Sequence, residues 1–108
     1  MVLEFADWQK AELKAAKILE VEEVPGKDKL YKLKIDLGSE KRQLVAGIKP
    51  FYAKEKLLGR TIIVIANLQP RMIAGLESQG MLLAVQNAKG GFTTLTVDDD
   101  VPPGTRVE

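Results

Sequence analysis

The sequence predicts an all-β domain, because short runs of β-branched and apolar residues alternate with turn signals along most of the chain. The clearest run is 61–68, which reads Thr-Ile-Ile-Val-Ile-Ala-Asn-Leu. Turn-forming pairs such as Pro25-Gly26 and Gly90-Gly91 separate the runs. Many short strands at regular spacing are typical of a barrel or a sandwich. With 108 residues, of which 45% are hydrophobic, the chain fits a single domain over residues 1–108.

The N-terminal part of the chain can be read in two ways. Alanine and lysine residues up to Ala16 favour a helix, and Asp7 is placed to cap it. The apolar residues within 18–24 suit either a helix or a strand. We expect a short helix at about residues 4–10, followed by a strand that ends near residue 24. Helix propensity alone would make the helix longer.

The remaining elements follow from alternation and from turn residues. Residues 30–37 alternate best, with Leu33, Ile35 and Leu37 on one face, and predict a half-buried strand. Residues 50–58 are expected to form a second helix, since proline suits its first turn and glycine its end. The other expected strands are 43–48, 61–68, 81–86 and 92–97, with a hairpin turn at Gly90-Gly91 between the last two.

The residue types that the chain lacks limit its chemistry. It has no cysteine, so disulfides, thiolate metal sites and cysteine nucleophiles are excluded. It has no histidine, which is the commonest general base and metal ligand. We therefore expect no catalytic residues, no metal site and no cofactor. No uncharged apolar run approaches about 18 residues, and the N-terminus does not read as a signal peptide, so we expect a cytoplasmic protein without a membrane partner.

Charge is distributed unevenly along the chain. The net charge at pH 7 is +1, but residues 1–26 carry −3, residues 27–60 carry +6 and residues 61–108 carry −2. The middle segment holds 10 of the 16 basic residues. A fold could gather these side chains into one basic face that binds nucleic acid. On charge alone, a solvated lysine-rich surface is the more ordinary interpretation.

Residues 67–84 carry the most specific pattern, Asn-Leu-Gln-Pro-Arg-Met-Ile-Ala-Gly-Leu-Glu-Ser-Gln-Gly-Met-Leu-Leu-Ala. This segment closely resembles the signature of the tRNA-binding domains found at the C-terminus of methionyl-tRNA synthetases and as free-standing homodimers. That signature reads Asn-Leu-x-Pro, a basic cluster, then Ser-x-Gly-Met. Three other stretches resemble the same family in the same order. They are Asp28-Lys29-Leu30-Tyr31 with Ile35-Asp36-Leu37-Gly38, the strand 42–48, and Leu58-Gly59-Arg60.

The resemblance implies a fold and a function. The fold would be an OB-type five-stranded barrel with a short N-terminal helix and a C-terminal dimerisation extension. The function would be non-catalytic, shape-selective binding of tRNA by a homodimer. Such a protein could assist a methionyl-tRNA synthetase catalytic chain by presenting or retaining tRNA. Shape recognition suits RNA, because the deep groove of the A-form helix hides the base edges.

Six residues are carried over from the family motifs as tRNA contacts. They are Lys29, Arg42, Asn67, Arg71, Ser78 and Met81. A serine hydroxyl can bond a phosphate or a 2′-hydroxyl, a methionine offers a base an apolar surface, and an arginine can fork onto a phosphate. Without the resemblance, Ser78 and Met81 would be read as a turn residue and a core residue. Asn67 could equally be a turn former, and Lys29 could pair with its neighbour Asp28.

The signature is incomplete, and a second function shares the fold. Met72 and Ala74 stand where lysine and arginine are frequent in the family, so the positive charge has to come largely from residues 27–60. Peptide-binding export chaperones of the CsaA type share the barrel and the dimer. They lack most of the Asp-Lys-Leu-Tyr and Ser-x-Gly-Met patterns that this chain has, so tRNA binding is the favoured hypothesis. Nothing in the sequence supports a nuclease.

Overall fold

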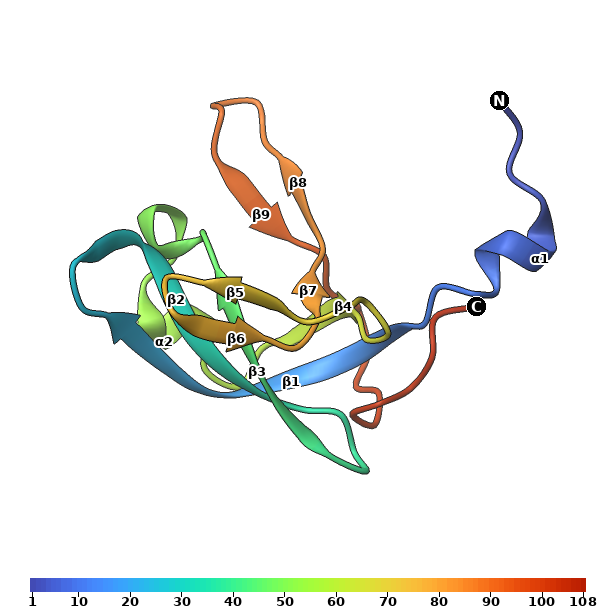
Figure 1. The fold of residues 1–108 in the computed structure, drawn as a ribbon, viewed down its shortest axis with the longest axis horizontal. Coiled ribbons are helices and arrows are strands. Elements are labelled where there is room, and N and C mark those ends of the chain that lie inside the picture. Colours follow the sequence, from blue (N-terminus) through green and yellow to red (C-terminus); the bar gives the residue numbers. More distant parts are fainter.

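One antiparallel five-stranded sheet organises the computed structural model, which describes residues 1–108. Its strands lie in the order β3-β2-β1-β4-β7 (Figure 1). They are β1 (Leu13–Val24), β2 (Lys27–Asp36), β3 (Lys41–Ala46), β4 (Thr61–Ile65) and β7 (Met81–Leu82). The all-β class is confirmed, and the main sheet has the predicted five strands.

Two hairpins and three helical turns complete the fold. Strand β5 (Arg71–Ile73) pairs with β6 (Leu76–Ser78), and β8 (Ala84–Gln86) pairs with β9 (Phe92–Thr94). The helical elements are α1 (Phe5–Trp8), the 3-10 helix η1 (Lys49–Phe51) and α2 (Lys54–Leu57). The predicted short N-terminal helix and the strand that ends at Val24 are therefore confirmed. None of these helices is long and apolar enough to cross a membrane.

Strand pairing alone does not close the main sheet, which differs from the predicted barrel. The edge strands β3 and β7 share no ladder of hydrogen bonds. Strand β7 contains only Met81 and Leu82, so it offers β3 too little edge for one. The gap is crossed instead by the residues that precede β7, where the Gln79 N–H donates to the Gln43 carbonyl at 2.8 Å.

Strand β1 bends and thereby belongs to both halves of the sheet. Its first half pairs with β4 and its second half with β2. The register with β2 shifts between Ile18 and Glu20, which marks a β-bulge. At the bend, the Ile18 N–H donates to the Arg60 carbonyl at 3.0 Å, and the Ile18 carbonyl accepts the Gly59 N–H at 2.9 Å. The bend therefore attaches the connection between α2 and β4 to the middle of β1.

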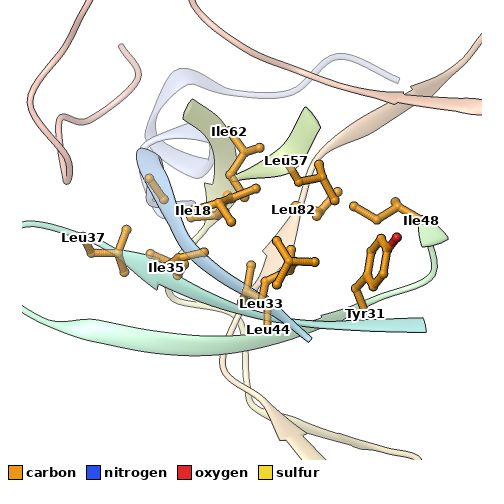
Figure 2. Packing of buried hydrophobic residues seen from close by; sticks show 14 residues of the cluster. Ile18, Tyr31, Leu33, Ile35, Leu37, Leu44, Ile48, Leu57, Ile62 and Leu82 are labelled. Carbon is orange, nitrogen blue, oxygen red and sulfur yellow. The ribbon is translucent and has the colours of Figure 1, made fainter. Parts of the chain in front are cut away.

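Fourteen buried residues form a single apolar core between the strands and α2 (Figure 2). On β2, Leu33 and Ile35 are 0% and 1% exposed, as the alternation along residues 30–37 predicts. Leu57 of α2 and Ile62 of β4 face them across the cluster in Figure 2 and are also fully buried. Burial of one such side chain contributes roughly 1.5–3 kcal/mol, so this cluster supplies much of the free energy of folding.

The predicted helix over residues 50–58 is wrong as a single element. Two short helical turns take its place, and Tyr52 and Ala53 lie between them in extended conformations. Tyr52 leaves the helical path because its hydroxyl reaches β9, where it accepts the N–H of Thr94 at 2.9 Å. A contact distant in the sequence therefore overrides the local helix signal.

The strand pattern differs from the prediction at two further places. The sequence does not predict the β5–β6 hairpin, whose turn residues Ala74 and Gly75 have φ angles of 52° and 78°. Positive φ at both positions defines a type I′ turn, which usually carries Asn-Gly or Asp-Gly, so the alanine conceals it. The strand predicted over 81–86 is divided at Leu83, whose N–H donates to the Ile63 carbonyl at 2.8 Å.

The two ends of the chain meet at one end of the molecule, where α1 and the C-terminus lie close together (Figure 1). The C-terminal segment runs along the first half of β1, with the Ala15 N–H donating to the Thr105 carbonyl at 2.8 Å and the Val107 N–H to the Leu13 carbonyl at 2.8 Å. A Cβ at Gly104 would lie 2.2 Å from the Leu37 carbonyl oxygen, so only glycine fits there. The segment thus takes the place beside β1 that β2 leaves empty.

Truncation of a core leucine should destabilise the domain more than truncation of an exposed one. Leu33→Ala is expected to lower the free energy of unfolding by about 2–5 kcal/mol, because it leaves a cavity at a fully buried position. Leu58→Ala, at a position that is 50% exposed, is the matched control, with an expected loss below about 1 kcal/mol. Urea denaturation followed by circular dichroism measures both losses. Equal losses would contradict the assigned core.

Candidate nucleic-acid interface

A groove of about 210 Å³ lies between the end of β3 and the segment that carries the family signature. We call it the β3–β7 groove. Seven of its twelve lining residues are hydrophobic. The full set of twelve lining residues is Val45, Ala46, Gly47, Ile48, Leu68, Gln69, Arg71, Ile73, Ser78, Gly80, Met81 and Leu82. Three of the six predicted contact residues, Arg71, Ser78 and Met81, therefore meet in one groove.

Arg71 and Met81 are free to contact a ligand. Both side chains are exposed, Met81 to 45%. Arg71 makes no ion pair and no side-chain hydrogen bond within the chain. Lys29, at the start of β2, is also exposed and unpaired, and its carbonyl would lie 3.9 Å from a Cβ added to Gly47 of the groove. Arg71 and Met81 thus supply one charge and one apolar surface in the groove, and Lys29 carries a further charge on the strand whose backbone lies next to Gly47.

Ser78 is placed differently, because its side chain is only 4% exposed. The Ser78 hydroxyl accepts the N–H of Val45 at 3.0 Å and donates to the Gly80 carbonyl at 3.1 Å. It therefore serves as the partner that the edge of β3 lacks. The hydroxyl keeps one lone pair without a partner, and its contact with RNA stays a prediction.

Arg42 is also engaged within the fold. Its guanidinium donates to the Ala66 carbonyl at the end of β4 and forms an ion pair with Glu40. The side chain is 27% exposed and joins β3 to the strand on the far side of the gap. A bidentate contact with phosphate would require Arg42 to give up these partners, because its guanidinium is already engaged. The RNA contact of Arg42 stays a prediction.

Asn67 joins the signature to the N-terminal segment. Its side-chain oxygen accepts the N–H of Glu12 at 2.9 Å, and its amide nitrogen donates to the Lys10 carbonyl at 2.6 Å. The side chain lies outside the β3–β7 groove. These bonds hold the segment that follows α1 against the end of β4. The contact of Asn67 with RNA stays a prediction.

The sequence does not single out Gln43 and Gln79, which join β3 to the segment around the β5–β6 hairpin next to the groove. The Gln43 N–H donates to the Gln79 side-chain oxygen at 3.0 Å, and the Gln43 side chain donates to the Glu77 carbonyl at 2.9 Å. Gln79 stands at the variable position of the Ser-x-Gly-Met pattern, so the motif gives no reason to select it. These bonds fix the β5–β6 hairpin against β3.

Ion pairs neutralise part of the basic segment. Lys32 pairs with Glu22 and Lys49 with Glu23, each at 3.0 Å, and Arg42 pairs with Glu40. The hydrogen bond and the charge of Lys49 hold the pKa of Glu23 below its ordinary value. The lysines of this segment that make no ion pair are Lys27, Lys29, Lys34, Lys41, Lys54 and Lys56. No group of acidic side chains could hold a metal ion.

A groove at a sheet edge that combines apolar residues with an unpaired arginine suits the binding of nucleic acid. The family model described as "Putative tRNA binding domain" matches residues 13–106. The chain belongs to this family of tRNA-binding domains.

Relatives and solved structures are similar to the chain over most of its length. The chain is 53% identical over 103 residues to "Methionine--tRNA ligase" of Thermotoga maritima and 50% identical over 101 residues to that of Caldanaerobacter subterraneus, covering 94% of this chain but only 16% of each relative. The crystal structure of the MetRS-related protein from Pyrococcus horikoshii superposes with a TM-score of 0.93 at 32% identity, covering 100% of this chain and 99% of that one. The CsaA chaperone from Bacillus anthracis superposes with a TM-score of 0.89 at 27% identity over 100% of both chains.

Removal of the Ser78 hydroxyl should destabilise the fold. Ser78→Ala leaves the N–H of Val45 buried without an acceptor, and we expect a loss of about 1–3 kcal/mol in the free energy of unfolding. Ser39→Ala is the control, since Ser39 is exposed and its hydroxyl makes no hydrogen bond. Thermal unfolding followed by circular dichroism compares the two variants. If the Ser78 variant were as stable as the Ser39 variant, the Ser78 hydroxyl would not stabilise the fold in the way described.

Proposed function

We propose that this chain binds folded tRNA through the β3–β7 groove and performs no chemistry itself. The observation that carries the proposal is the groove, which contains the exposed Met81 and the unpaired Arg71, with the backbone of the unpaired Lys29 next to Gly47. It lies in a chain of the tRNA-binding domain family. The groove offers an apolar wall to an unstacked base and two charges to the neighbouring phosphates.

The size of the groove favours recognition of local shape over the reading of a long sequence. About 210 Å³ accommodates little more than one base, so the remaining contacts have to fall on the RNA backbone. Gly80 lets the chain pass close to β4 beside the groove, because a Cβ there would lie 3.0 Å from the Ile65 carbonyl oxygen and 3.4 Å from Leu44. Shape and phosphate contacts together would make binding tolerant of tRNA identity.

The part of the relatives that the chain matches supports a proposal for its role in the cell. The chain spans 16% of the length of the methionine–tRNA ligases that it resembles, so it matches one part of those enzymes. We therefore propose that it presents or retains tRNA for a methionyl-tRNA synthetase catalytic chain in the cytoplasm. Such a handle raises the local concentration of tRNA without adding a reactive group.

A homodimer is the proposed form of the protein. Leu3, which precedes α1, is 62% exposed, and Phe5 of α1 is 70% exposed. Phe5 lines a hollow together with Trp8 and Val107. Arg106 ties this end together by donating to the Gln9 carbonyl. A second copy placed across this apolar end would bury it and double the basic surface offered to tRNA.

One observation favours a second candidate function, the binding of unfolded peptide. The CsaA chaperone from Bacillus anthracis shares the fold at a TM-score of 0.89, and seven of the twelve groove residues are hydrophobic. A peptide would then occupy the same groove as RNA. Competition between an unfolded peptide and tRNA distinguishes the two, because a chaperone should bind peptide in preference.

Affinity for tRNA should depend on the free groove residues and on salt. Arg71→Ala and Lys29→Ala are each expected to lower the slope of log affinity against log salt by about 0.7–0.9, because each removes one phosphate contact. Met81→Ala should weaken binding at every salt concentration with little change in that slope. A salt series of tRNA gel shifts measures these effects.

The control for the charge variants is Lys17→Ala, which removes an exposed, unpaired lysine of β1 outside the groove. Its salt slope should equal that of the wild type. If the wild-type chain binds no tRNA at low salt, the proposed function is wrong.

The exposed apolar end should control the state of association. Phe5→Glu places a charge on the surface proposed to be buried between two copies, and we expect it to convert a dimer into a monomer. Light scattering coupled to size exclusion measures the mass. Val2→Glu, at a residue that is 93% exposed, should have a smaller effect on the mass than Phe5→Glu. A wild-type monomer at high micromolar concentration would refute the dimer.

A further inference from the structure

A second surface combines aromatic rings with lysines. Phe51 of η1 and Phe92 of β9 are each 42% exposed, and their ring centroids lie 5.8 Å apart in an edge-to-face arrangement at 64°. Lys56 of α2 and Lys89 of the β8–β9 turn line the same hollow. We call these four residues the Phe51–Phe92 patch. Figure 1 shows the β8–β9 hairpin projecting from the main sheet.

The rings are not required to hold the hairpin, because polar contacts already do so. The Tyr52 hydroxyl accepts the N–H of Thr94 at 2.9 Å and lies 3.1 Å from the Thr93 hydroxyl. Arg60 donates to the Thr94 hydroxyl at 3.0 Å, and Thr94 is only 5% exposed. The exposed parts of the Phe51 and Phe92 rings are therefore not needed to position the hairpin.

The turn that carries Lys89 has a fixed shape. The Asn87 side-chain oxygen accepts the N–H of Lys89 at 2.9 Å and the N–H of Gly91 at 3.1 Å. A Cβ at Gly91 would lie 3.1 Å from a ring carbon of Phe51, so glycine lets the ring rest against the turn. Neither Lys56 nor Lys89 takes part in an ion pair. The patch thus presents ordered rings beside two uncompensated positive charges.

We infer that the Phe51–Phe92 patch is a second RNA contact, which stacks an unpaired base on its rings while Lys56 and Lys89 hold the adjacent phosphates. The inference rests on the proposed tRNA binding and adds a site outside the β3–β7 groove. Exposed aromatic rings combined with unpaired cations are the features that single-stranded nucleic acid requires. Stacking on a ring is tolerant of sequence, because every base has a π-face. The partner is therefore a single-stranded segment of the RNA whose folded part lies in the groove.

The test compares variants by fluorescence anisotropy with total tRNA and with an unstructured RNA of about ten nucleotides, a length within the usual site sizes. Phe92→Ala should weaken binding of both RNAs by roughly 5- to 150-fold, and Phe92→Tyr should retain affinity because tyrosine also stacks. Lys89→Ala, at an exposed position that needs no repacking, should lower the salt slope by about 0.7.

Val85→Ala is the matched control on the same hairpin. Val85 pairs with Thr93 whereas Phe92 pairs with Gln86, so Val85 lies on the opposite face, where it is 49% exposed. It should bind RNA like the wild type. Circular dichroism of each variant establishes that the fold is retained.

The outcomes separate this inference from the proposed function. If Phe92→Ala and Lys89→Ala bind both RNAs like the wild type while Arg71→Ala weakens tRNA binding, the second contact is overturned and the groove stands. If the wild-type chain binds no tRNA, both proposals fall. If Phe92→Ala weakens binding of an unfolded peptide and leaves RNA binding unchanged, the patch is a peptide site and the inference is wrong.

Discussion

Hydrogen bonds with Ser78 and Gln79 take the place of a missing strand pairing at the edge of the sheet. Strand β3 has no ladder on the side that faces β7, and the buried Val45 N–H on that edge bonds Ser78. A buried N–H without an acceptor costs about 1–3 kcal/mol, so this contact constrains everything around it. The same hydroxyl donates a hydrogen bond to the Gly80 carbonyl and thereby fixes the start of β7. The β3–β7 groove exists because this gap is bridged at points and not along its whole length.

The signature residues divide into those that build the groove and those that face outward from it. Arg42, Asn67 and Ser78 have their polar atoms bonded within the chain. Lys29 and Arg71 do not, and Met81 offers an exposed apolar surface. A pattern associated with RNA binding can therefore be partly a pattern for folding the strand edge at which binding occurs. Substitution of the first group tests the scaffold, and substitution of the second group tests the contact.

Local patterns in the sequence predict most of the strands, because alternation reports directly on burial. Residues 30–37 show this best, with Leu33 and Ile35 in the core. The prediction is wrong where distant contacts decide, as at Tyr52, whose bond to Thr94 breaks the expected helix. It also misses the β5–β6 hairpin, because the type I′ turn is formed by Ala74, an unusual residue at positive φ. The candidate site came mostly from family motifs, and those could not reveal that half of its side chains are engaged in the fold.

The location of the tRNA contact is measured most directly by ¹⁵N NMR of the chain titrated with total tRNA to saturation. If the groove is the binding site, the amides of Gly47, Arg71 and Met81 should show large changes in shift or intensity. The outer face of β1 should change little, for example at Lys17, which is exposed and lies outside the groove. Saturation that leaves Gly47, Arg71 and Met81 unchanged, with the changes confined to that outer face, would contradict the central claim.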